Sequence, residues 1–377
     1  YNALITYVIP GSPAAQAGLE RGDWIMKVDT SYISKKYETY LLQGTKAVKL
    51  TLGEWKEVEI EDEEDGNEGG DGEDEGPTME YRVVPIDDPV EMPAAQIVED
   101  NPVHKYEIIE SPVKKIRVGY LMYNSFTAGT KAEPEKYNNE LRSVSQKFKE
   151  AGVQAVILDL RYNEGGSMDC VQLLGTILTS ADRLGEPMAY LEYNDKNTDK
   201  DATILFGTDR EINLNLHSLI AITSGTTMGA PEMLIRSLFL EDTYPIATVG
   251  SSTKGQNVAT EQFINEEFLW SVNPVVCTVY NSQHDTYGAI SPATDLKVSE
   301  TTIDGSTNYS EFLPFGTFDK DGKSERLLKI AIGVLDGTYP PKDDETPEES
   351  TTQTRFKVEK SVSSPASRRF SSKGLRL

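Results

Sequence analysis

The chain has 377 residues and a formal net charge of −24, from 61 acidic against 37 basic side chains. This length allows two domains with hydrophobic cores of their own, and the 38% of hydrophobic residues is typical of globular proteins. The charge opposes electrostatic binding to nucleic acid or to an anionic bilayer, and with no run of about twenty apolar residues no transmembrane segment is predicted.

Residues 1–88 alternate short strands with turns and are predicted to form a small β-rich domain. ALITYVI (3–9) is typical of a strand rather than a signal peptide, because it lacks a basic region and a small-residue cleavage site. A short helix is expected over 35–45. The stretches AVKLTLG (47–53) and MEYRVVPID (79–87) alternate apolar and polar residues, which predicts the two strands of a hairpin.

An insert at 54–77, made largely of acidic residues and glycine, separates these two strands. Its self-repulsion and low apolar content predict a solvated, disordered loop. A low-affinity calcium site is the alternative, although the spacing does not match an EF-hand. Such a long loop is tolerated because closure entropy grows only logarithmically with length.

The remainder of the chain divides by composition. Residues 89–112 have prolines and mixed polarity and are expected to form a connector, while 113–340 alternate strand-like and helix-like stretches. This alternation predicts a mixed or parallel sheet covered by helices. Residues 341–377 are rich in Pro, Thr and Glu and then in Ser and basic residues, which predicts a low-complexity tail. Strands are expected over 115–126, 154–166, 218–224 and 244–252, and helices over 134–152, 169–180, 230–241 and 326–337.

Cysteines and histidines provide no metal-binding pattern. Cys170 and Cys277 form no CxxC pair and lie near no histidine at ligand spacing, so one disulfide and two buried thiols both remain open. The three histidines are scattered along the chain. We therefore predict neither a metal site nor a cofactor.

Five motifs occur in an order that resembles one family. GSPAAQAGLERGDWIMKVD resembles the GSPAxxAGLxxGDxIxxVD signature of bacterial PDZ domains. VILDLRYNEGGSM, ITSGTTMGAPEML, TVGSSTKGQNV and AISPATDLKV resemble, in turn, the DLRxNxGG, TASASEIL, TFGKG and GIxPDxxV segments of the C-terminal processing peptidases, also called tail-specific proteases. The resemblance covers roughly residues 1–298. It implies a β-rich, PDZ-like domain followed by a mixed α/β peptidase core of the crotonase-like, ClpP-like type.

The resemblance also implies a catalytic pair, because these peptidases use a serine nucleophile with a lysine base. With the nucleophile segment aligned on Glu232, the serine falls on Gly229, which has no side chain to attack a carbonyl. With the base segment aligned on Thr253, the lysine falls on Gln256. An amide takes up no proton near neutral pH, so this residue cannot serve as that base.

The oxyanion-binding parts are retained in the sequence. Ala230 follows the nucleophile position and keeps its N–H, and the pair Gly165 and Gly166 allows the close backbone approach that the resemblance implies. In isolation, a strand followed by two glycines indicates only a tight turn.

Two functions follow. The favoured one is a weak or inactive relative that binds polypeptide substrates or peptide C-termini through its PDZ domain and its cleft. The alternative is an active serine-type peptidase in which Ser224, Thr226 or Thr227 acts with Lys254, which an extended chain would direct to the same face as Gln256. Turn formation and helix capping are the more ordinary roles of these hydroxyls.

The resemblance implies export to the bacterial cell envelope, with the periplasm as the expected compartment. Nucleic acid is not an expected partner. The sequence indicates neither the substrate nor the oligomeric state.

Overall fold

The structure is a computed structural model whose residues group into two compact units. It describes residues 1–37, 41–60, 78–268, 270–298, 312–319, 324–340 and 374–377. The first unit contains Tyr1–Asp100 and residues 312–313, and the second contains 101–298, 314–319, 324–340 and 374–377. Three residues of the helix expected over 35–45, most of the acidic insert (61–77) and most of the expected tail (341–373) lie outside the described residues.

The first unit is β-rich, as predicted. Its sheet has the order β1-β2-β4-β5, with β3 paired to β2 and β6 paired to β4. The elements are β1 (Ala3–Leu4), α1 (Pro13–Gln16), β2 (Trp24–Val28), β3 (Ser31–Tyr32), β4 (Val48–Ile60), β5 (Thr78–Pro85) and β6 (Val90–Met92). Helix α1 begins where the Ser12 hydroxyl accepts the N–H of Ala15 at 3.2 Å, a typical N-cap. The hydrophobic core of this unit consists of Leu19, Ile25, Val28, Ile33 and Leu50.

The hairpin expected on either side of the acidic insert is present but longer than predicted. Strands β4 and β5 pair from Gly53 opposite Pro85 as far as Ile60 opposite Thr78. Trp55 lies in this extension, and its ring stacks on Trp24 at 5.9 Å between ring centroids. The first residues of the expected insert therefore belong to the sheet, and aromatic contacts of this kind stabilise their pairing.

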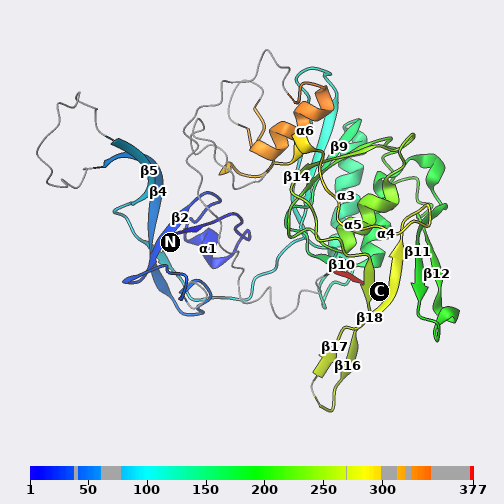
Figure 1. Cartoon of the computed structure of the whole chain (residues 1–377), viewed down its shortest axis with the longest axis horizontal. Coiled ribbons are helices and arrows are strands. Elements are labelled where there is room, and N and C mark those ends of the chain that lie inside the picture. The colour runs from blue at the N-terminus through cyan, green and yellow to red at the C-terminus, as the bar shows by residue number, and fades with distance from the viewer. Residues whose placement is uncertain (38–40, 61–77, 269, 299–311, 320–323, 341–373) are drawn as a thin grey trace, which may run out of the picture. The chain divides into compact units, whose positions relative to one another are not determined.

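The second unit contains two larger sheets and a projecting two-stranded hairpin (Figure 1). The five-stranded sheet has the order β14-β13-β9-β8-β7, and the six-stranded sheet has the order β10-β19-β15-β18-β11-β12. The strands are β7 (Val103–Glu110), β8 (Arg117–Tyr123), β9 (Ala155–Asp159), β10 (Gly165–Ser167), β11 (Pro187–Tyr193), β12 (Ala202–Leu205), β13 (Leu219–Thr223), β14 (Ile246–Gly250), β15 (Val258–Thr260), β16 (Phe263–Asn265), β17 (Trp270–Val272), β18 (Val275–Tyr280) and β19 (Gly374–Arg376). The helices are α3 (Lys136–Glu150), α4 (Met168–Leu178), α5 (Ala230–Leu238) and α6 (Arg326–Asp336), with short 3-10 turns η1 (Ala181–Arg183), η2 (Thr198–Lys200) and η3 (Thr294–Leu296).

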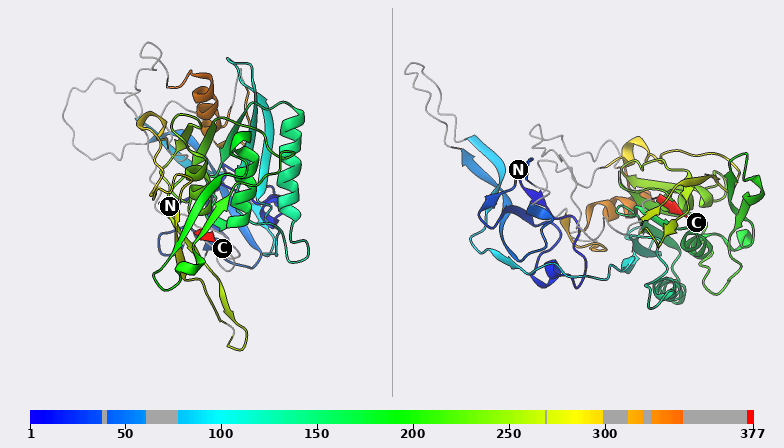
Figure 2. Two further views of the ribbon diagram at one scale, coloured as in Figure 1. Left: turned by 90° about the vertical axis from the view of Figure 1, so that its right-hand side faces the viewer. Right: turned by 90° about the horizontal axis from the view of Figure 1, so that it is seen from below.

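Helices cover both faces of the five-stranded sheet. Helix α6 packs against β13 and β14, and α3 packs against β7 on the other face (Figures 1 and 2). Helices α4 and α5 pack against each other beside the six-stranded sheet. This mixed α/β architecture confirms the predicted fold class. No helix within the described ranges is both long enough and apolar enough to cross a bilayer.

The stretch 89–112, predicted to be a connector, contains two strands, and the boundary between the two units falls between them, after Asp100. Strand β6 pairs with β4, and β7 forms an antiparallel edge next to β8. Val103 and Ile109 of β7 are buried, whereas the residues between them are polar or partly exposed. Pro102 and Pro112 lie just outside this strand, where proline does not interrupt the ladder of hydrogen bonds.

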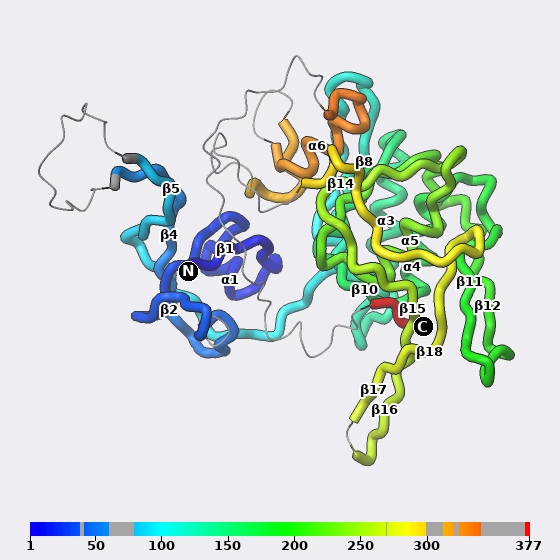
Figure 3. The backbone as a smooth tube through the Cα atoms, in the orientation of Figure 1, coloured from blue at the N-terminus to red at the C-terminus, as the bar shows by residue number. Residues whose placement is uncertain are grey.

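The predicted tail also needs correction at its last residues. Strand β19 lies between β10 and β15 and runs parallel to both (Figure 3). A segment of three residues has little intrinsic strand preference, so its conformation comes from pairing with these two neighbours.

Both cysteines are buried and free, which settles the alternative left open by the sequence. Burial raises the pKa of the Cys170 thiol to about 12 and that of the Cys277 thiol to about 11. Both side chains are therefore protonated near neutral pH and belong to the hydrophobic core.

Candidate active site

The candidate residues follow three neighbouring parallel strands. Gly165 and Gly166 come after β9, Gly229 and Ala230 come after β13, and Gln256 comes after β14. These strands are adjacent in the order β14-β13-β9 and parallel to one another. Because the carboxyl ends of parallel strands meet at one edge of a sheet, the topology brings the predicted positions together.

The turn between β13 and α5 has the geometry of a nucleophile turn. Gly229 is the N-cap of α5 and adopts φ 70° and ψ −100°, a conformation that is strained for any residue with a side chain. Serine nucleophiles of the G-x-S-x-G type lie on strained strand-to-helix turns of this kind. Ala230 is the first residue of the helix, so its N–H has no acceptor within the helix.

A buried carboxylate joins this turn to the loop after β14. Oε2 of Glu232 accepts the N–H of Gly229 at 2.8 Å and the N–H of Gln256 at 2.9 Å. Its Oε1 accepts the N–H of Gly255 at 2.5 Å and the hydroxyl of Thr253. One side chain therefore holds both candidate catalytic positions. From the sequence, Glu232 served only to align the motif, although an acid three residues after an N-cap indicates such a bond.

We expect replacement of Thr253 by valine to lower the free energy of unfolding by about 1–3 kcal/mol. The Thr253 hydroxyl donates to Glu232 and accepts the N–H of Ile290 at 2.8 Å, and valine leaves both buried groups without this partner. Urea unfolding of the two proteins measures the difference. The matched control is Thr243→Val at an exposed site, expected to change stability by less than about 0.5 kcal/mol. Equal effects of the two substitutions would contradict this role of the hydroxyl.

The glycine pair is positioned by Asn163, for which no role was predicted from the sequence. The buried side chain donates from Nδ2 to the carbonyl of Tyr123 at 2.8 Å. Its Oδ1 accepts the N–H of Gly165 at 3.0 Å. Of the two glycines predicted for the oxyanion site, Gly165 thus already uses its N–H inside the turn.

The three hydroxyls considered as replacement nucleophiles are bonded to the loop after β9. The hydroxyls of Thr226 and Ser224 both donate to the carbonyl of Arg161, the former at 2.8 Å. The hydroxyl of Thr227 donates to the carbonyl of Leu160 at 2.9 Å and accepts the N–H of Ser224 at 3.0 Å. These bonds build the turn, which is the ordinary role weighed for these residues.

The two candidate base residues differ in their surroundings. Lys254 has an exposed side chain, and its backbone N–H donates to the carbonyl of Thr227 at 3.0 Å. Gln256 is half-buried, and its Oε1 is buried with no hydrogen-bond partner within the described residues. An unpaired buried amide oxygen costs free energy, so the hydrogen bonding around the site is incomplete at this atom.

A buried ion-pair cluster lies at the carboxyl end of β9. Arg161 is fully buried and donates from Nη2 to Asp159 at 2.7 Å and from Nη1 to Glu325 at 2.8 Å. Its guanidinium lies 5.1 Å from the centroid of the Phe315 ring. The hydroxyl of Tyr120 donates to Asp159 at 2.8 Å. The cluster thereby positions the carbonyl of Arg161 that receives bonds from the nucleophile turn. No role was predicted for this arginine from the sequence.

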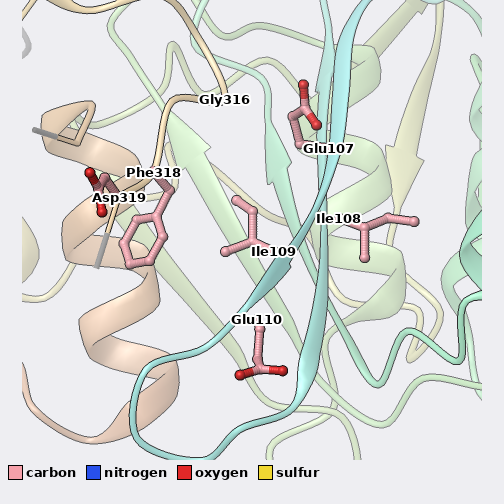
Figure 4. Close-up of a pocket in the computed structure, with 7 residues that line it drawn as sticks. All are labelled: Glu107, Ile108, Ile109, Glu110, Gly316, Phe318 and Asp319. Carbon is pink, nitrogen blue, oxygen red and sulfur yellow. The ribbon is translucent and has the colours of Figure 1, made fainter. Parts of the chain in front are cut away.

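A separate pocket of about 330 Å³ lies along the edge strand β7 (Figure 4). It is lined by Glu107, Ile108, Ile109, Glu110, Gly316, Phe318 and Asp319. None of these is a candidate catalytic or oxyanion residue, so this pocket does not form part of the site.

Comparisons with known proteins show what the chain is similar to. The sequence profile of peptidase family S41 matches residues 117–273, which include every candidate position, and a PDZ domain profile matches residues 4–51. A crystal structure from Bacteroides fragilis NCTC 9343, described as an S41 protease, is 38% identical over 89% of this chain and 78% of that chain, with a TM-score of 0.72.

More distant structures are also similar to the chain. The photosystem II D1 C-terminal processing protease is 17% identical over 79% of this chain and 68% of that chain, with a TM-score of 0.43. A protein from Parabacteroides merdae ATCC 43184, described as a peptidase, is 21% identical over 61% of this chain and 66% of that chain, with a TM-score of 0.38. No curated protein matches the chain.

Proposed function

Because the chain belongs to peptidase family S41 and carries a PDZ domain, we propose that it is a member with little or no peptidase activity that binds polypeptide segments. One observation carries this proposal. At the strained turn before α5, where the resemblance expects a serine, Gly229 provides no side chain. At the position of the lysine, Gln256 provides an amide. Removing one member of such a pair costs several orders of magnitude in rate, and both are replaced here.

Peptide binding does not depend on the missing pair. The N–H of Ala230 remains at the start of α5, where it points to no helical acceptor. PDZ domains bind extended peptides by adding them as a strand to a sheet edge, through backbone hydrogen bonds. Polypeptide segments are therefore the class of ligand that we propose for both parts of the chain.

The alternative, an active peptidase with a displaced nucleophile, has less support. A nucleophilic hydroxyl must lie within hydrogen-bond reach of its base. Ser224, Thr226 and Thr227 instead donate to backbone carbonyls. Within the described residues no hydrogen bond joins the amine of Lys254 to any hydroxyl.

We expect the purified chain to release no peptides from casein above a protein-free control. Lys254→Ala is expected to behave like the parent, and no residue from 224 to 227 is expected to react with a fluorophosphonate probe for active-site serines. Peptide release by the parent that disappears in Lys254→Ala would overturn the proposal and establish serine–lysine chemistry with displaced residues. Reaction of any of these hydroxyls with the probe would do the same.

We also propose a location in the bacterial cell envelope, in the periplasm. The family resemblance supports this proposal, and so does the bacterial source of the relative with 38% identity. Fractionation of cells that express the protein from its natural gene, followed by immunoblotting, tests it. Recovery of the protein with the cytoplasmic fraction would contradict it.

A further inference from the structure

The segment 374–377 of the chain fills a space between two strands beside the candidate site. Strand β19 pairs with β10, where Gly374 lies opposite Gly165, and with β15, where Leu375 lies opposite Ala259. Strands β10 and β15 are separated in the sheet by β19 (Figure 3). Because neighbouring strands lie about 4.8 Å apart, this space is a slot one strand wide.

The two walls of the slot have partners that do not involve β19. Strand β15 pairs with β18. On the other wall, Phe126 donates its N–H to the carbonyl of Gly165 at 2.9 Å and accepts the N–H of Ser167 at 2.7 Å. Strand β10 also leads directly into α4. Both walls are therefore held in place independently of the strand that fills the slot.

The backbone of Gly374 lies where the candidate residues meet. A Cβ atom added to Gly229 would lie 2.4 Å from the carbonyl carbon of Gly374, and one added to Gly165 would lie 1.8 Å from its carbonyl oxygen. A Cβ atom added to Gly374 would lie 2.3 Å from Oε1 of Gln256. A peptide carbonyl thus occupies the point between the nucleophile, oxyanion and base positions, where a substrate backbone would bind.

The contacts of the segment define what the slot accepts. Residue 374 favours glycine, because its φ is +93°, and a side chain there would also displace the end of the Gln256 side chain. Leu375 is 1% exposed and packs into the main hydrophobic core. Backbone bonds hold the rest: the N–H of Gly374 donates to the carbonyl of Glu164 at 2.7 Å, and the N–H of Leu377 donates to the carbonyl of Thr260 at 3.0 Å. The slot therefore recognises an extended backbone and a glycine followed by leucine.

We propose that this slot is a binding site for extended polypeptide segments that carry glycine followed by leucine, and that 374–377 is its intramolecular ligand. The inference rests on the proposed function, because a cleft without its catalytic pair retains a bound segment uncut. The segment is part of the same chain as the slot. A ligand in the same chain faces its site at a high effective concentration, so a free peptide competes poorly with it in the parent chain.

The test compares binding of a fluorescein-labelled peptide, SSKGLRL, to the full parent chain and to its Gly374→Val variant. Valine is strained at φ +93° and displaces the Gln256 side chain, which weakens binding of the segment, so the variant is expected to bind the free peptide at least about tenfold more tightly than the parent. The peptide SSKVLRL is expected not to bind. Gly288→Val is the matched control, since a Cβ at Gly288 meets no atom within 4 Å, and it is expected to behave like the parent.

Equal binding of the peptide by the parent and a folded Gly374→Val variant would overturn the proposal. If the Gly374→Val variant fails to fold, hydrogen exchange in the parent chain provides a second test. In the parent chain, the amides of 374–377 are expected to exchange their hydrogens at least about 100-fold faster than those of β9, because a ligand leaves its site without global unfolding. Equal exchange of β19 and β9 would show an integral strand and overturn the proposal. Casein cleavage by the parent would contradict the proposed function. Peptide binding tests the slot separately, so failure of one proposal can be told from failure of the other.

Discussion

Replacement of Arg161 by alanine is expected to lower the free energy of unfolding by about 3–5 kcal/mol, because it leaves two buried carboxylates without their cation. Asp159 is fully buried and Glu325 is 1% exposed, and both are bonded to the guanidinium. Glu325 also accepts the N–H of Leu328 at the start of α6. Urea unfolding followed by circular dichroism measures the loss by linear extrapolation.

The matched control for this substitution is Arg142→Ala. Arg142 lies 3.7 Å from Glu135 in an ion pair whose side chains are 40% and 59% exposed. Exposed pairs of this kind contribute at most about 1 kcal/mol, so the control is expected to change stability little. Arg161→Lys keeps the charge but loses the bidentate geometry, and an intermediate loss is expected. Equal losses for Arg161→Ala and Arg142→Ala would contradict a stabilising role of the cluster.

Restoring the catalytic pair is expected to produce peptidase activity only when the segment 374–377 leaves its slot. A serine at position 229 places a Cβ atom 2.4 Å from the carbonyl carbon of Gly374, so the two cannot coexist in this arrangement. We expect the triple variant Gly229→Ser, Gln256→Lys, Gly374→Val to cleave casein about 100-fold faster than the parent or more, since such a pair contributes several orders of magnitude. The double variant that keeps Gly374 is expected to be slower than the triple variant.

Release of acid-soluble peptides from casein measures this gain. The control carries Gly229→Ala with the same two other substitutions, so that it has the same Cβ atom in the slot but no hydroxyl, and it is expected to be inactive. An inactive triple variant that still binds the SSKGLRL peptide would contradict Gly229 as the nucleophile position. Equal activity in the alanine control would point to a contaminating protease.

Local patterns in the sequence predicted much of the fold. The elements expected at 154–166, 169–180, 218–224, 230–241 and 244–252 correspond to β9 with β10, α4, β13, α5 and β14, whereas β11 and β12 were not predicted. The start of α5 is an example: Gly229 at the N-cap, Pro231 in the first turn and Glu232 three residues after the cap all favour a helix beginning there. Patterns like these depend on residues a few positions apart, so they can be recognised without the tertiary structure.

The roles of several site residues could not be predicted in this way. Arg161 follows a strand that is buried throughout, and its partner Glu325 is far away in the sequence, at the start of α6. Glu232 looks like a capping residue, but its bonds to Gly255 and Gln256 cross to a different loop. Only the packing of the strands brings these groups together.

The sequence by itself determined the β-rich first unit, the mixed α/β second unit and the residue types at the candidate catalytic positions, because periodicity, turn residues and motif spacing are local properties. The tertiary structure alone decided that 103–110 is an edge strand, that both cysteines are free and that 374–377 enters the sheet beside Gly229. The physical reason is that strand pairing joins residues distant in the chain. The three residues of β19 take their conformation from β10 and β15 rather than from their own preference.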